Sequence, residues 1–330
     1  MKVLFIGGTG NISTASSCLA VELGMELWHL NRGTSGNPIR GVNTLHCDIN
    51  NVEKARQLLA SHTWDAVVNW VAFTAADVER DIALFGGRTE QYVFISSASC
   101  YQSPPESPVI TETTPLSNPY WEYSRNKIAC EQTLMAAFET SGFPATIVRP
   151  SHTYSTVIPI AIGGWTEYTT IDRMLRGQPV VVQGDGTSLW VLTHAEDFAK
   201  GFTGLLGRSE SIGEAYHITS DEVLTWNQIY RHLGAAVGVE PQLVHVTSDK
   251  ICRYDPEYTG SLLGDKSCSV IFDNTKIKQL VPDYSCTTLF SEGIKTTLEW
   301  FDAEPARKQV DAATNTMMDR LIAAELAQIS

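Results

Sequence analysis

Short apolar runs alternate with helical stretches along the first half of the chain. Apolar segments typical of strands lie at residues 2–6, 26–30, 44–47, 66–72, 92–96 and 145–149. The segment 66–72 barely alternates, which indicates a strand buried on both faces. Helices are predicted at 12–23, 52–61 and 120–140. This rhythm predicts an α/β fold built on a doubly wound parallel sheet with helices on both faces.

The rhythm changes after Pro150. A short strand at 180–182 precedes the turn Gly184-Asp185-Gly186-Thr187, and a helix is expected at 194–206. Residues 215–219 form a predicted strand that returns to the sheet, and the chain ends in a predicted helix near 311–328. Because no repeat or linker separates the halves, we expect a second domain that is interleaved with the first.

Composition narrows the class of protein. The chain has 330 residues, 43% hydrophobic and 18% charged, which is typical of a globular protein. Its net charge of −13 makes it a poor general binder of nucleic-acid phosphates or anionic lipid. The seven cysteines show no CxxC spacing, and no apolar run resembles a signal peptide or membrane span, so a cytoplasmic protein with free thiols is expected. No cluster has metal-ligand spacing, and no metal is expected.

The segment Gly7-Gly8-Thr9-Gly10-Asn11-Ile12-Ser13 follows the first strand and opens the first helix. A dinucleotide-binding loop has this position. Gly7 permits the tight turn, and Gly10 lets the backbone approach a pyrophosphate at the helix N-terminus. Ser13 stands where a third glycine is usual. A plain strand-to-helix turn is the alternative, but we expect cofactor contacts from Gly7, Thr9, Gly10, Asn11 and Ile12.

The end of the second strand bears on the choice of cofactor. Asn31-Arg32-Gly33 lacks the acid that usually holds the ribose of NAD. Asn31 could bond a hydroxyl weakly, whereas Arg32 could pair with a 2′-phosphate, which slightly favours NADP over NAD. Arg32 could also be a merely exposed arginine. Asp48 and Ile49, after the third strand, could bracket the adenine, although Asp48 could equally be a turn residue.

Tyr123 and Lys127 are four residues apart and share one face of the long predicted helix. A nearby ammonium favours the phenolate, so Tyr123 could act as a general base, and Lys127 could also bond a nicotinamide ribose. Upstream, Ser97 follows the fifth strand, where a hydroxyl could orient a substrate oxygen towards Tyr123. Strand end, helix face and glycine loop would then meet at the carboxyl edge of the sheet.

In the order and spacing of these motifs, the chain resembles extended short-chain dehydrogenases/reductases of the NAD-dependent epimerase/dehydratase type. The resemblance also includes residues 149–154, the turn at 184–187, and the segment Thr193-His194-Ala195-Glu196-Asp197. It implies Ser97 as the catalytic hydroxyl, Tyr123 as the base and Lys127 as its partner. The further cofactor contacts that we expect are Val71, Ala72 and Pro150.

The resemblance also implies an architecture. A Rossmann domain would comprise residues 1–154 and 194–222, and a smaller, discontinuous α/β substrate domain would comprise 155–193 and 223–330. The implied assembly is a homodimer that packs two helices of each subunit, including residues 120–140.

Three positions depart from the pattern of sugar-nucleotide epimerases. His152 stands where an asparagine is usual, and Trp190 and Leu262 stand where arginines are usual. Two bidentate phosphate donors are thereby replaced by apolar side chains, which favours a substrate without a nucleotide diphosphate. The alternative is that other residues, such as Arg173 or Arg176, bind the phosphates.

The candidate substrate residues are Ser97, Ser99, His152 and Trp190. Trp190 could stack on a sugar ring or belong to the core, and His152 could donate one bond or be structural. His194 is interpreted as structural, with Asp197 capping the next helix. Cys100 lies near the proposed site, where we favour a buried, unreactive thiol over a reactive one.

These residues predict a hydride-transfer enzyme, an epimerase or dehydrogenase acting on a secondary alcohol or ketone of a sugar-type substrate. Dehydration is least favoured, because Ala98-Ser99 stand where the dehydratase type has an Asp-Glu pair. A nucleotide-sugar 4-epimerase with other phosphate ligands is the alternative. A non-catalytic RNA-binding or cofactor-sensing protein on the same fold is the rival class, and the absence of a basic run with interleaved aromatics argues against RNA binding.

Overall fold

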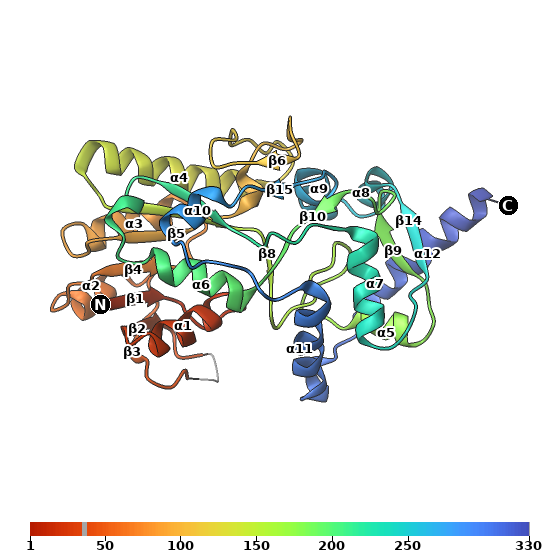
Figure 1. Cartoon of the computed structure of the whole chain (residues 1–330), viewed down its shortest axis with the longest axis horizontal. Coiled ribbons are helices and arrows are strands. Elements are labelled where there is room, and N and C mark those ends of the chain that lie inside the picture. Colours follow the sequence, from red (N-terminus) through yellow and green to blue (C-terminus); the bar gives the residue numbers. More distant parts are fainter. Residues whose placement is uncertain (35–37, 330) are drawn as a thin grey trace.

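The main sheet confirms the predicted doubly wound parallel α/β fold. The computed structural model describes residues 1–34 and 38–329. Its seven-stranded sheet has the order β12-β7-β5-β4-β1-β2-β3, with every neighbouring pair parallel (Figure 1). The strands are β1 (Lys2–Ile6), β2 (Glu26–Asn31), β3 (Asn43–His46), β4 (Ala66–Asn69), β5 (Tyr92–Ile95), β7 (Ala145–Pro150) and β12 (Ala215–Ile218).

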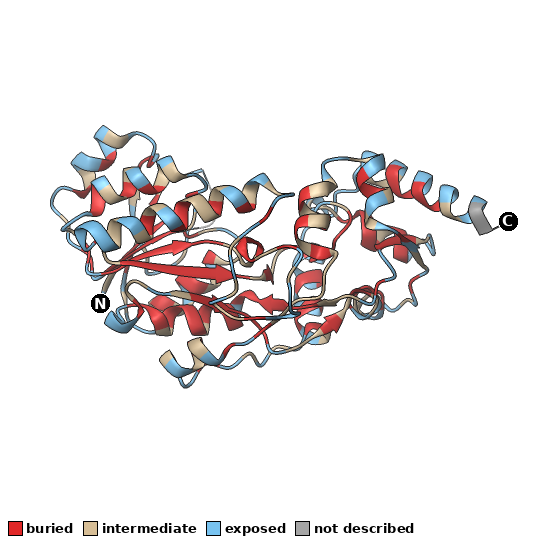
Figure 2. Ribbon diagram, turned by 90° about the horizontal axis from the view of Figure 1, so that it is seen from above, coloured by how far each residue is buried: buried red, intermediate tan, exposed pale blue. Residues whose placement is uncertain are grey.

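Helices cover both faces of this sheet. Side chains of α2 (Val52–Leu59), α3 (Ala75–Phe85) and α4 (Glu122–Ser141) form the core on one face. Those of α1 (Ser13–Glu22), α6 (Ala195–Leu205) and α10 (Thr275–Leu280) form the core on the other. The central strands are buried because both faces are covered (Figure 2).

A second, smaller half lies beside the carboxyl edge of the sheet and has a hydrophobic core of its own (Figure 1). Its helices are α5 (Thr169–Leu175), α7 (Trp226–Ala236), α8 (Ser248–Tyr254), α9 (Tyr258–Ser261), α11 (Phe290–Asp302) and α12 (Ala312–Ile329). The remaining described strands form four two-stranded sheets. The pairs are β8 (His152–Tyr154) with β11 (Leu192–His194), β9 (Val180–Gln183) with β14 (Leu243–Val246), β10 (Leu189–Trp190) with β13 (Leu224–Thr225), and β6 (Val109–Ile110) with β15 (Ile271–Phe272).

The predicted domain boundaries stay a prediction. Residues 275–280 fall in a segment assigned to the substrate domain, yet Ile277 of α10 packs in the core beneath the main sheet. Within the described residues, no helix combines the length and apolar character that crossing a membrane would need.

Two element boundaries differ from the predicted ones because asparagine side chains turn the chain. β4 ends at Asn69, whose Oδ1 accepts the amides of Val71 (2.7 Å) and Ala72 (2.8 Å). Helix α3, which the pattern did not predict, follows this turn. Helix α4 begins at Glu122 rather than at residue 120, because Asn118 Oδ1 accepts the amides of Tyr120 and Trp121 just before the helix.

The predicted cap of helix α6 was wrong. The N-cap is His194, whose Nδ1 accepts the amide of Glu196 at 3.4 Å. Asp197 lies in the first turn instead, where it accepts the amide of Thr288 at 2.8 Å and pairs with Lys200 at 2.6 Å. Asp197 therefore holds the segment before α11 against helix α6, while His194 has a structural role.

A buried ion pair joins α4 to β7. Arg149 donates to both carboxylate oxygens of Glu131, at 3.0 and 2.6 Å, and both side chains are less than a tenth exposed. Ser96 at the end of β5 donates to the same carboxylate. One helix and two strands are thereby fixed by a single buried charge pair.

We expect Arg149→Met to lower the free energy of unfolding by about 3–5 kcal/mol, because it leaves the Glu131 carboxylate buried without its cation. Urea unfolding of the full chain measures this. Arg56→Met is the matched control, since it breaks the exposed pair with Glu53 and should change stability little. Adding Glu131→Leu to Arg149→Met should recover much of the loss, and an unchanged single variant would contradict the account.

Candidate active site

A cavity of about 510 Å³ opens at the carboxyl edge of the main sheet. It is lined by the loop after β1, the segment after β5, the first turns of α4, the segment after β7, and the π-helical turn η3 (Leu262–Lys266). β1 lies between β2 and β4, so the chain leaves the sheet in opposite directions on either side of it. Ligands of such sheets bind at this switch point.

The loop after β1 requires glycine at two adjacent positions. Gly7 and Gly8 have φ of 98° and 102°, a region that favours glycine. A Cβ on Gly8 would lie 2.5 Å from Nε2 of His29. Ser17 Oγ donates to the Gly8 carbonyl and lies 2.9 Å from the same imidazole nitrogen. Burial lowers the pKa of His29 to about 4, so the packed ring is neutral at pH 7.

The end of this loop faces the cavity. The amide of Gly10 donates to Ser13 Oγ at 2.8 Å, so the serine in the third glycine position braces the turn. Asn11 donates to the carbonyl of Thr153 at 2.9 Å and accepts the amide of Thr156 at 3.1 Å, which ties the loop to the strand β8. A Cβ on Gly10 would meet only Ser13 Oγ within 4 Å, so this face is open to a bound phosphate.

The predicted adenosine contacts lie outside the cavity lining. Asn31 Oδ1 accepts the amide of Gly33 at 3.0 Å, and Arg32 is exposed beside it. Asp48 is exposed, and its Oδ1 accepts the amide of Asn50, so Asp48 has the turn role that the sequence left open. Ile49 is buried. Gly7, Thr9, Val71 and Ala72 also lie outside the lining, whereas Gly10, Asn11, Ile12 and Pro150 are part of it.

Lys127 is held at the meeting point of two strand ends. Its ammonium donates to the carbonyls of Ala72 (2.7 Å) and Ile95 (2.8 Å). The rings of Phe73 and Phe94 lie 4.6 and 4.7 Å from the nitrogen. Burial lowers the pKa of Lys127 to about 8.

Tyr123 lies one helical turn before Lys127 and also lines the cavity. Its ring centroid is 5.9 Å from the Lys127 ammonium. Burial raises the pKa of Tyr123 to about 12, and the hydrogen bond from Ser97 opposes that shift. Burial therefore favours the protonated phenol of Tyr123, whereas the sequence favoured a phenolate near neutral pH.

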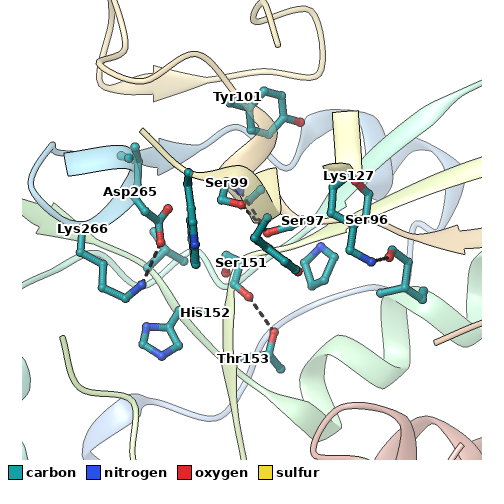
Figure 3. Close-up of a pocket in the computed structure, with 18 of the residues that line it drawn as sticks. Ser96, Ser97, Ser99, Tyr101, Lys127, Ser151, His152, Thr153, Asp265 and Lys266 are labelled. Atoms are coloured by element: carbon teal, nitrogen blue, oxygen red, sulfur yellow. Dashed lines mark hydrogen bonds and ion pairs between the residues drawn. The ribbon is translucent and has the colours of Figure 1, made fainter. Parts of the chain in front are cut away.

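The serines after β5 form a short hydroxyl chain. Ser97 Oγ lies 2.9 Å from Ser99 Oγ, and Ser124 of α4 donates to Ser99 at 2.7 Å. Figure 3 shows Ser96, Ser97 and Lys127 on one side of the cavity and Asp265, Lys266 and His152 on the other. The sequence-predicted groups Ser97, Tyr123 and Lys127 thus share one cavity with the glycine loop.

The opposite wall combines the predicted residues His152 and Trp190 with residues that sequence reasoning missed. Trp190 is buried and its Nε1 donates to Nδ1 of His152 at 3.4 Å. Asp265 and Lys266 pair at 2.9 Å in the turn η3. The sequence pattern used Gly264-Asp265 only to locate Leu262, so the charged side chains of Asp265 and Lys266 were not considered. The other missed wall residues are Trp121 and Trp165.

In the described part of the chain, no arginine lines this cavity. Arg173 is buried and donates to Asp319 at 2.8 Å, and Arg176 pairs with Asp172 at 3.1 Å outside the lining. Leu262 is fully buried in the core of the second half. The arginines considered as substitute phosphate ligands are therefore engaged elsewhere.

Comparison with known proteins agrees with this fold. Residues 83–219 match the NAD dependent epimerase/dehydratase family. A 2'-dehydrokanamycin reductase of Streptomyces kanamyceticus is 25% identical over 290 residues, which cover 86% of this chain and 80% of that protein. The chloroplast stem-loop binding protein of 41 kDa b of Arabidopsis thaliana is 24% identical over 74% of this chain and 65% of its own length.

Solved structures share the architecture. A dTDP-glucose 4,6-dehydratase from Bacillus anthracis in complex with NAD superposes with a TM-score of 0.73 at 18% identity, covering 93% of this chain and 98% of its own. A UDP-glucose 4-epimerase from Thermotoga maritima with UDP-glucose gives a TM-score of 0.71 at 20% identity, covering 92% and 99%. These likenesses show that the chain shares its fold with both structures.

We expect Cys100 to resist alkylation in the native protein. It is fully buried behind Ser96, and burial together with the Glu131 carboxylate raises the pKa of its thiol to about 12, so almost no thiolate forms near neutral pH. Iodoacetamide at pH 7.5 followed by peptide mass spectrometry should label the exposed Cys18 and leave Cys100 unmodified until denaturant is added. Equal labelling of the two thiols would contradict this.

Proposed function

We propose that the protein is a nicotinamide-dependent reductase of a ketone on an uncharged, sugar-type substrate, in line with the match of residues 83–219 to the NAD dependent epimerase/dehydratase family. The observation that carries the proposal is one cavity in which Tyr123, Ser97 and Lys127 adjoin the glycine loop, with no arginine in its described lining.

The residues present fit a dinucleotide. The open face of Gly10 would receive the pyrophosphate, Lys127 would hold the nicotinamide ribose, and the adenosine would lie over the ends of β2 and β3 near Arg32 and Asp48. A bound nicotinamide cofactor would supply the hydride.

A protonated Tyr123 is the form that a reduction requires. Since burial raises the pKa of Tyr123 to about 12, its hydroxyl carries the proton that a ketone oxygen must receive. Ser97, whose hydroxyl adjoins that of Tyr123, would turn its one proton to the same ketone oxygen and fix its position. The ammonium of Lys127, 5.9 Å from the ring, would stabilise the phenolate left after the proton transfer.

The charge of the cavity supports a substrate without a diphosphate. Bidentate guanidinium groups are the usual phosphate ligands of proteins, and none lines the described cavity. The relative from Streptomyces kanamyceticus is named for a reduction and not for a nucleotide sugar. We therefore place reduction ahead of nucleotide-sugar epimerisation, the alternative that needs Arg173 or Arg176 at the phosphates.

Two further properties are part of this proposal. We expect a homodimer that packs through α4 and a neighbouring helix, as the family resemblance implies. We do not propose RNA binding despite the similarity to the chloroplast stem-loop binding protein, because the net charge is −13. A gel shift at physiological ionic strength would revive that role.

We expect Tyr123→Phe to reduce ketone turnover by about 10²–10⁴-fold while leaving cofactor binding intact, because it removes only the proton donor. NADPH oxidation with a panel of keto-sugars measures turnover, and cofactor fluorescence measures binding. Tyr120→Phe is the control, since Tyr120 is 43% exposed and outside the cavity lining. Full turnover by Tyr123→Phe on a substrate that the native protein reduces would refute the mechanism.

We expect NADPH to be preferred over NADH, because Arg32 is exposed at the end of β2 where a 2′-phosphate would lie. Arg32→Ala should weaken NADPH binding by about tenfold or more and leave NADH unchanged. Arg56→Ala on α2 is the control for a general loss of positive charge. Tighter binding of NADH by the native protein would show that the cofactor is NAD.

A further inference from the structure

The wall of the cavity opposite Lys127 is built of indole rings around one ammonium. Nζ of Lys266 lies 5.6 Å from the ring centroid of Trp121, 5.5 Å from Trp165 and 5.8 Å from Trp190. Trp190 is buried, whereas Trp165 is 41% exposed. The reaction proposed above uses none of these side chains.

His152 offers this wall a hydrogen-bond donor that has no partner. Trp190 Nε1 can only donate, so Nδ1 of His152 is the acceptor of their hydrogen bond. Burial and the ammonium of Lys266 lower the pKa of His152 well below its ordinary value, so the ring is neutral and carries its proton on Nε2. That nitrogen is buried and unpartnered, and His152 as a whole is 7% exposed.

Asp265 and Lys266 supply a hydrogen-bond acceptor and a hydrogen-bond donor whose opposite charges cancel each other. Oδ2 of Asp265 accepts from Lys266 at 2.9 Å, and the lysine side chain is 3% exposed. The three indole faces further stabilise the ammonium. The pair therefore presents hydrogen-bonding atoms to the cavity without an excess of positive charge.

We propose that this wall, comprising Trp121, His152, Trp165, Trp190, Asp265 and Lys266, is a subsite for an uncharged sugar ring. The apolar face of the ring would lie on indole, and its hydroxyls would bond the Nε2 proton of His152 and the Asp265–Lys266 pair. The inference rests on the proposed function only for the place of the reacting carbonyl, which would face Tyr123.

A nucleotide-linked sugar fits this wall less well. Two phosphates would bring negative charge beside the Asp265 carboxylate, where Lys266 is already neutralised. A neutral ring exchanges hydroxyl bonds to water for bonds to the same groups and covers indole surface. The subsite therefore selects against the nucleotide-linked form of the same sugar.

The test measures equilibrium binding of sugar probes to the full chain with NADPH present, and tryptophan fluorescence reports the binding. The probes are a set of methyl α-hexopyranosides and the UDP conjugates of the same hexoses. His152→Leu should weaken binding of the preferred methyl glycoside by about tenfold, and His152→Gln, which keeps a donor, should restore most of it. Asp265→Asn should weaken it similarly.

Asp302→Asn is the matched control for Asp265→Asn. It neutralises a carboxylate that also pairs with a lysine, Lys308 at 2.6 Å, but lies outside the cavity lining. We expect it to leave glycoside binding unchanged.

The outcomes separate this inference from the proposed function. Glycoside binding that depends on His152 and Asp265 supports the subsite even when no keto-sugar is reduced, and Tyr123→Phe should retain that binding. Tighter binding of the UDP conjugates, no binding of any methyl glycoside, or binding indifferent to both His152→Leu and Asp265→Asn would overturn it, whether or not the protein reduces ketones.

Discussion

The arrangement of the site depends on one buried cation. Once Lys127 is removed from water, its ammonium needs acceptors, and it finds them in the carbonyls of Ala72 and Ile95. The Ile95 carbonyl ends β5 and the Ala72 carbonyl follows the adjacent parallel strand β4, so both lie at the same edge of the sheet. The lysine therefore fixes helix α4 against β4 and β5, and Tyr123, one turn earlier on that helix, is placed at the cavity by the same contact.

A second buried charge pair extends this framework to the next strand. Glu131 is one helical turn beyond Lys127, and its carboxylate holds Arg149 at the end of β7 and Ser96 at the end of β5. Ser97 is the next residue, so the position of the proposed oxygen-binding hydroxyl follows from the same network. The cavity is thus located by polar contacts buried within the sheet, while its far wall belongs to a separate core.

Much of the sheet and the near side of the cavity could be predicted because their signals are local. The strands and the Tyr123–Lys127 spacing depend on neighbours a few residues apart. The Asn69 side chain ends β4 early, which no periodicity reports, whereas helix α3 was missed although its capping box, Thr74 and Asp77, is a local signal. The Asp265–Lys266 pair was missed because it meets Trp190 only through the fold. The direction of the pKa shift of Tyr123 could not be read from sequence spacing, because burial in the folded chain raises that pKa.

The distribution of buried charges also explains why the cavity wall is aromatic and carries little net charge. The guanidinium groups of Arg149 and Arg173 are both buried against carboxylates, where their role is to hold strands and helices together. Indole and imidazole occupy the wall instead, and the one ammonium there is neutralised by its neighbour Asp265. A site of this kind draws its selectivity from shape, hydroxyl hydrogen bonds and exclusion of excess negative charge rather than from attraction of phosphate.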